Sequence, residues 1–194
     1  STLSTTPSGV ITVTPGTATK VRVETAANGS GAVAPPQSLP SGSSITVYAI
    51  TRDALNNFVA NVAATAWTLE NSTGGVVAGD LVPAADGKSA VFTAHVLGSA
   101  DIKASSSTLT TTPSGVITVT PGTASKVRVE TAANGSGTVV PTQSLASGSS
   151  ITVFAITRDA SNNFLANVAA DLWNIENITG GIVAGDLVSA ADKK

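Results

Sequence analysis

The side chains that could carry catalysis are scarce in this sequence. His95 is the only histidine, so a general base of this type would have to be this residue. The 194 residues contain no Gly-x-Ser-x-Gly elbow and no recognisable Ser–His–Asp grouping. We expect His95 to be a structural or surface residue in the middle of a strand. We therefore predict that the protein is not an enzyme and has no catalytic residue.

Acidic side chains occur singly, and at the same places in both halves of the chain. A calcium site needs several oxygen ligands in one place, but these residues form no Asp-x-Asp cluster, and the absence of cysteine excludes thiolate ligands. We expect solvated acids on turns and strand edges, with no metal and no cofactor. Four of the recurring pairs are Asp53 and Asp159, Glu70 and Glu176, Asp80 and Asp186, and Asp86 and Asp192.

Two tryptophans and their aromatic neighbours are the residues that could stack on a sugar ring. Each tryptophan lies in an alternating apolar segment, which favours packing in a core over exposure on a binding platform. A cluster of exposed aromatic side chains would instead indicate carbohydrate binding. The residues concerned are Trp67, Trp173, Tyr48 and Phe154.

Four Asn-x-Ser/Thr triplets match the pattern of N-glycosylation acceptors. All four lie near expected turns, where a glycan could be attached. A chain rich in Ser and Thr also produces this short pattern by chance, so the triplets alone do not establish modification. The asparagines are Asn28, Asn71, Asn134 and Asn177.

Charge and hydropathy exclude several classes of partner. The net charge is −2, so no basic field is present to attract nucleic acid. No apolar run approaches the roughly 18 residues that a membrane-spanning helix needs. The opening "STLSTTPSG" lacks the basic start and apolar stretch of a secretion signal. We expect no nucleic-acid partner, no membrane insertion, and, if the protein is exported, a chain without its leader.

The most informative feature of the sequence is a long internal repeat. The phrase "TPSGVITVTPGTA" occurs at residues 6–18 and again at 112–124, so that Pro7 and Pro113 set a period of 113 − 7 = 106 residues. Residues 1–88 align with 107–194 without a gap, with 17 differences and 71 (88 − 17) identities. This period is too long for a solenoid repeat and matches the size of one small all-β domain.

Strand-like segments follow one another through the first copy of the repeat. "TKVRVET" at 19–25 alternates, with its valines on one face and Lys20, Arg22 and Glu24 on the other, solvated face. Turn formers such as Asn28–Gly29 separate the segments, and no helical period is found. Seven short strands, with a tryptophan on the third, predict an all-β, immunoglobulin-like sandwich. The remaining strands are expected at 43–53, 64–71, 74–82 (weak), 89–97, 100–107 and 114–122.

The chain also resembles the bacterial immunoglobulin-like repeats of invasin- and intimin-type surface adhesins. The resemblance is carried by Arg52–Asp53 at a strand end, the turn Asn56–Asn57, "VANV" at 59–62 and Gly87–Lys88 before the late strands. Asparagine replaces the usual turn glycine of that family, which the turn tolerates because asparagine adopts positive φ readily. The resemblance implies an extracellular array of stalk domains and no catalytic residues.

Lysines on the first strands raise one further possibility within this resemblance. Some bacterial surface domains of this class cross-link such a lysine to an Asn or Asp on the last strand. The last strand here, "SGVITVTPG", contains neither residue type. We therefore expect Lys20 and Lys126 to be solvated.

The repeat and the resemblance together divide the chain into three parts. We expect residues 1–17 to be the last strand of a preceding repeat, 18–122 a complete domain, and 123–194 a second domain that is incomplete at its C-terminal end. Lys194 corresponds to Lys88, so the second copy lacks counterparts of residues 89–106. An arbitrary fragment boundary explains this arrangement, and donation of the lone first strand to another chain is the alternative.

These observations predict a non-enzymatic structural spacer of an extracellular or cell-surface, adhesin-type protein. Its partners would be neighbouring copies of the same repeat, joined by short "TPGTA" junctions in which Pro15 and Pro121 limit bending. Two alternatives remain open. One is a self-assembling extracellular filament subunit that exchanges strands, and the other is a module that binds a surface polysaccharide or a host receptor.

Overall fold

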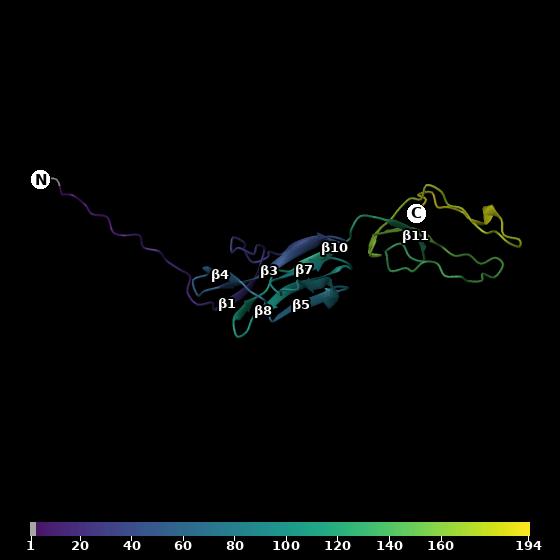
Figure 1. The fold of residues 1–194 in the computed structure, drawn as a ribbon. Helices are drawn as coiled ribbons and strands as arrows, with labels where there is room; N and C mark the ends of the chain where they lie inside the picture. The colour runs from purple at the N-terminus through teal and green to yellow at the C-terminus, as the bar shows by residue number, and fades with distance from the viewer. Residues whose placement is uncertain (1–2) are drawn as a thin grey trace.

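The computed structural model describes residues 3–194, which are nearly all β (Figure 1). We call residues 18–122 the first copy and residues 123–194 the second copy. The first copy holds ten strands and one 3-10 turn: β1 (Lys20–Glu24), β2 (Gln37–Pro40), β3 (Ser44–Arg52), β4 (Phe58–Asn61), β5 (Ala66–Gly74), η1 (Ala78–Asp80), β6 (Leu81–Pro83), β7 (Ser89–Thr93), β8 (Gly98–Ser105), β9 (Thr110–Thr112) and β10 (Ile117–Thr120). No helix in residues 3–194 has the length and apolar character needed to cross a bilayer.

Two sheets form the first copy. One has the order β6-β7-β3-β1-β9, with β4 also pairing with β3, and the other has the order β2-β10-β8-β5. A single buried cluster takes side chains from both sheets, among them Val23 and Phe92 from the first and Ile102 and Ile117 from the second. The two sheets therefore pack face to face, consistent with the β-sandwich that the strand pattern predicts.

The first two strands of the first copy pair in parallel with its last two strands. β9 pairs with β1 in parallel, with Lys20 opposite Thr110 and Arg22 opposite Thr112. β10 pairs with β2, also in parallel, and with β8 antiparallel. The C-terminal segment of the first copy thus contributes one strand to each sheet, β9 at the edge of the first and β10 inside the second.

The second copy forms fewer strands, although its sequence is nearly the same. It contains β11 (Lys126–Glu130), β12 (Phe154–Arg158), β13 (Phe164–Asn167) and the 3-10 turn η2 (Ala184–Asp186), with one sheet of order β11-β12-β13. β2, β5 and β6 have no strand counterpart here. In the first copy those strands pair with β10, β8 and β7, which have no counterpart after Lys194 in this sequence.

The tail at residues 3–17 is extended and forms no strand (Figure 1). Ile11 is 84% exposed, whereas Ile117, at the same place in the repeat, is fully buried in β10. The two segments differ only at Ser4, which corresponds to Thr110. Packing against a sheet, and not the local sequence, therefore decides whether this phrase becomes a strand.

Several strand predictions need correction. In place of the weak strand expected at 74–82, Gly74 ends β5, residues 75–80 form a connection that includes the 3-10 turn η1, and β6 begins at Leu81. The strand expected at 89–97 ends at Thr93, so His95 lies in the connection to β8 and not in mid-strand. β2, β4 and β9 were not predicted, because each has only three or four residues and too short an alternation to recognise.

Candidate functional site

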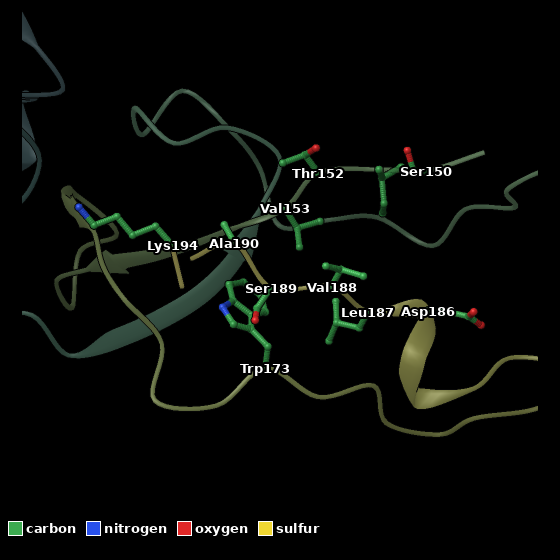
Figure 2. Close-up of a pocket in the computed structure, with 11 residues that line it drawn as sticks. Ser150, Thr152, Val153, Trp173, Asp186, Leu187, Val188, Ser189, Ala190 and Lys194 are labelled. Atoms are coloured by element: carbon green, nitrogen blue, oxygen red, sulfur yellow. The ribbon is translucent and has the colours of Figure 1, made fainter. Parts of the chain in front are cut away.

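One hollow in the second copy lies between residues 150–153 and 186–190 (Figure 2). It has a volume of about 360 Å³, and Trp173 and Lys194 complete its lining. The corresponding segments of the first copy are Ser44–Val47 of β3 and β6, and there β7 lies between them and pairs with both. The hollow therefore has the form of a slot for one β-strand.

A second, wider hollow of about 1080 Å³ opens between residues 143–153 and the segment near Ile182 and Leu187. Its apolar lining corresponds to core positions of the first copy. Leu145 is 49% exposed here, while its counterpart Leu39 is 8% exposed. This hollow therefore lies where core side chains pack together in the first copy.

His95 pairs with a buried carboxylate. Its Nδ1 lies 2.7 Å from Oδ1 of Asp80, whose Oδ2 accepts the backbone N–H of Val77. Ser41 lies close by, but its hydroxyl donates to the backbone carbonyl of His95 at 2.6 Å. The nucleophile of a catalytic triad directs its hydroxyl hydrogen at the imidazole ring. The Ser41 hydroxyl does not.

The recurring acids do not all have the solvated environment predicted for them. Asp53, Asp80 and Asp159 are buried, so the prediction is wrong for these three. Their carboxylates accept backbone and side-chain hydrogen bonds, which replace the lost water. Glu70 is half-buried and paired with Lys103 at 2.6 Å. The exposed acids are Asp86, Glu176, Asp186 and Asp192.

A metal ion has no ready-made ligand group in the part of the chain that the structure describes. Among residues 3–194, no three or more His, Cys, Asp or Glu side chains lie together in a way that could hold one.

Asp53 organises the loop at residues 53–57, which follows β3. Its Oδ1 accepts the backbone N–H groups of Leu55 and Asn57, and its Oδ2 accepts Asn57 Nδ2 and the N–H of Gly16, all at 2.9 Å. The pKa of Asp53 is lowered to about 2, first by the side-chain hydrogen bond from Asn57 and next by that from Gly16. Asn56 adopts φ 67°, as expected for an asparagine in the turn.

Asp159 organises the same loop in the second copy, at residues 159–163. It accepts the N–H of Gly122 at 2.9 Å and Asn163 Nδ2 at 2.8 Å. Burial acts to raise the pKa of Asp159, but the hydrogen bonds from Gly122 and Asn163 outweigh it and leave the pKa lowered.

The loop at 159–163 also touches the first copy. Asn163 donates from Nδ2 to the carbonyl of His95 at 2.8 Å, and its Oδ1 accepts the N–H of Leu97 at 3.1 Å. Ser161 Oγ lies 3.0 Å from Ser41 Oγ. Asn163 is buried in this contact, whereas its counterpart Asn57 is exposed. Sequence reasoning identified Asn56–Asn57 only as a turn, and missed the role of this asparagine at the junction.

A buried ion pair recurs below each loop. Arg52 donates to Glu24 from Nε and Nη2 at 2.6 and 2.7 Å, and to the carbonyls of Gly29 and Asn56 at 2.9 Å. This pairing raises the pKa of Arg52. Glu24 is fully buried, so the predicted solvated position is wrong. The loop between β1 and β2 folds back over the strand end and supplies the carbonyl of Gly29 that covers this pair.

The second copy repeats the pair as Arg158 and Glu130, with the same two distances. The side-chain hydrogen bond from Arg158 lowers the pKa of Glu130 against the opposing effect of burial.

The two lysines on first strands contact the same loops. Lys20 Nζ donates to Asn56 Oδ1 at 3.0 Å, and Lys126 Nζ donates to Asn162 Oδ1 at 2.8 Å. Both are exposed hydrogen bonds to the loop and do not involve β10.

The remaining candidates bond within their own copy. The indole N–H of Trp67 donates to the carbonyl of Gly87 and packs against the core, and that of Trp173 donates to Lys193, both at 2.9 Å. Tyr48 and Phe154 are half-buried. All four asparagines of the Asn-x-Ser/Thr triplets are exposed, although Asn71 lies inside β5, at its irregularity, and not in a turn.

The structure thus brings the recurring polar residues together at two kinds of place: the ion pair under each loop, and the junction between the copies. Comparison of the chain with protein-family models, with curated proteins and with solved structures gave no match.

Proposed function

We propose that the chain is a non-enzymatic spacer of an extracellular surface or adhesin-type protein, built from tandem immunoglobulin-like β-sandwich domains. Support comes from the two face-to-face sheets of the first copy and from the recurrence of the same sequence directly after it. A spacer needs length and resistance to pulling. Repeated units in series supply the length. The relative directions of the terminal strands determine the resistance to pulling.

The parallel pairing of β1 with β9 is the observation that carries this proposal. β1 begins the first copy and β9 lies near its end, so a pull on the two ends of the copy drives these strands past each other. Their hydrogen bonds are then loaded together and not one after another, which raises the force needed to open the sheet. β10 and β2 form a second parallel pair near the two ends.

The connection between the copies is short and is attached at both ends. The carbonyl of Thr120, the last residue of β10, accepts the N–H of Ser41 at 2.8 Å, and Ser125 N–H donates to Arg158 at 2.9 Å. Pro121 fixes its own φ, and Gly122 is held by Asp159. Few free torsions remain in the connection, as a stiff spacer requires.

Pulling single molecules of the full chain by its two ends tests the proposal. We expect the first copy to open in one sharp event. Thr110→Pro removes the N–H that donates to the carbonyl of Thr19 at 3.2 Å and changes no core side chain, so the opening force should fall, with a loss of about 1 kcal/mol in stability. Ser4→Pro, at the same place in the exposed tail, is the matched control. An unchanged opening force in Thr110→Pro would contradict the proposed role of the parallel pair.

Strand exchange between chains is a second candidate, favoured by the exposed tail. In the first copy, Thr110–Thr112 lie along β1 and Ile117–Thr120 along β2. The same registers would place residues 4–6 of one chain along Lys126–Arg128 of another, and residues 11–14 along 143–146. Val127, on the open edge of β11, is 66% exposed, whereas its counterpart Val21 is fully buried.

A further inference from the structure

We infer that the loop at residues 159–163 is a docking loop that fixes one copy on the end of the preceding copy, and that the loop at 53–57 is the same surface for the end of a further unit of this sequence. The inference deepens the proposed spacer function and rests on it for the identity of the partner. Asn163 is the residue that sets the orientation.

The first observation is the shape of the contact that Asn163 makes. Its carboxamide both donates to the carbonyl of His95 and accepts the N–H of Leu97, so it completes the bend between β7 and β8 as a neighbouring backbone would. A carboxamide with both ends engaged has one allowed orientation, in contrast to a single hydrogen bond, about which the side chain can pivot.

The second observation is that the asparagine is itself held from behind. Asp159 accepts from Asn163 Nδ2 and from the Asn163 backbone N–H, at 2.8 and 2.9 Å, and its Oδ2 also accepts the N–H of Gly122 in the connection. The connection, the loop and the first copy thus meet at one carboxylate. Bending at the junction would break several of these buried hydrogen bonds together.

The third observation concerns the loop at 53–57, which has the same internal bonds but no unit placed against it. Asp53 accepts from Asn57 and from Gly16 in the same way, while Asn57 is exposed. Leu55 occupies the place of Ser161 and is 83% exposed. The partner that fits this loop is the end of a unit with counterparts of His95 and Leu97, because those residues contact the equivalent asparagine, Asn163, within this chain.

The orientation can be measured on the full chain with two spin labels, since the sequence contains no cysteine to compete. Val82→Cys labels β6 of the first copy and Val127→Cys labels β11 of the second, and both positions are exposed. We expect one narrow distance peak, lost in Asn163→Ala and kept in Asn57→Ala. Both substitutions remove the same bond inside their loops, so only the contact with the first copy differs.

Asn163→Ala could also disturb the second copy itself, and amide hydrogen exchange in β12 detects this. Unchanged protection in β12 with a lost distance peak supports docking. If Asn163→Ala gives a distance peak as narrow as that of Asn57→Ala, the docking inference is overturned. It is also overturned if Asn163→Ala loses both the peak and the amide protection in β12. The label distance reports only the orientation of the copies, and the opening force reports only the resistance of the first copy to pulling. The docking inference can therefore be wrong while the spacer proposal is right, and the spacer proposal can be wrong while the docking inference is right.

The unused loop is tested by extending the chain. Joining a copy of residues 18–106 to Ser1 creates a whole additional unit ahead of the first copy, because residues 1–17 match 107–123 except at Ser4. We expect the side-chain amide signals of Asn57 to shift and to gain protection from exchange in the extended chain, and Asn57→Ala to free the new junction. Asn57 signals identical to those of the 194-residue chain would overturn this part of the inference.

Discussion

At the scale of single residues, buried charge is the main feature that the two copies share. Arg52 is satisfied on all sides, by the carboxylate of Glu24 and by carbonyls of the loops before β2 and after β3. A buried ion pair repays its desolvation only when such extra hydrogen bonds are present. The pair therefore ties both loops to the end of the sheet, and in doing so holds Asp53 in place for its own loop.

The carboxylate of Asp53 makes the stability of the first copy dependent on acid. Because its folded pKa is lowered to about 2, from an unfolded value of about 3.9, its contribution is present above about pH 4 and is lost as the pH falls toward 2. Asp53→Asn places a donor opposite the donors of Gly16 and Asn57. We expect this variant to have a lower thermal unfolding midpoint at pH 7, measured by circular dichroism, and the difference from wild type to shrink between pH 4 and pH 2. A difference that stays constant over this range would contradict the assignment.

At the scale of elements, partner strands decide which segments become strands. The alternating valines of β1 recur in β11, and both are strands because both find an antiparallel neighbour, β3 or β12. The counterpart of β5 keeps its tryptophan, yet residues 172–180 form no strand. Its pairing partner in the first copy is β8. Without a partner strand, the backbone N–H and C=O groups of residues 172–180 can only bond to water, and an extended conformation offers no further hydrogen bonds. The segment therefore stays irregular.

The glycine of the connection gives a prediction at this scale. A Cβ at Gly122 would lie 2.5 Å from the carbonyl oxygen of Ser41, at the end of β2, while a Cβ at Gly16 would meet only Asp53 at 3.5 Å. Gly122→Ala must therefore displace backbone and should cost about 2 kcal/mol, whereas Gly16→Ala should leave stability unchanged or slightly raised. Urea unfolding of the two variants measures this, and equal stabilities would contradict a close approach at the junction.

At the scale of the whole molecule, the copies follow one another along one direction, with the tail at 3–17 leading away from the first copy (Figure 1). The tail could complete another chain only in part. It carries counterparts of β9 and β10, but none of β7, which joins β6 to β3, or of β8, which joins β5 to β10. A donated tail would leave the slot of Figure 2 and the centre of the second sheet unfilled.

The spacer proposal therefore predicts a monomer in solution. Light scattering should report a molar mass near 19.0 kDa over a wide range of concentrations. A mass that grows with concentration would favour strand exchange, and Ile11→Asp should then abolish the growth, because residue 11 would have to enter a core as Ile117 does. Val10→Asp is the control, since Val116, its counterpart, is 46% exposed.

The sequence alone predicts the repeat, its period and the all-β character of the chain. It also determined the strands with long alternation, such as β1 and β3, and the turns at Asn28–Gly29 and Asn56–Asn57, because these depend on residues adjacent in the chain. Short strands without a clear period, such as β9, depend on a partner from elsewhere and could not be predicted.

Which polar groups are buried depends on how distant segments pack. Glu24 alternates with valines as a solvated residue does, and becomes buried because a loop folds over it. Asn57 and Asn163 have the same neighbours in sequence, and they differ only because one faces solvent and the other faces His95 and Leu97. Burial and docking are set by contacts between distant segments, so identical phrases acquire different roles in the two copies.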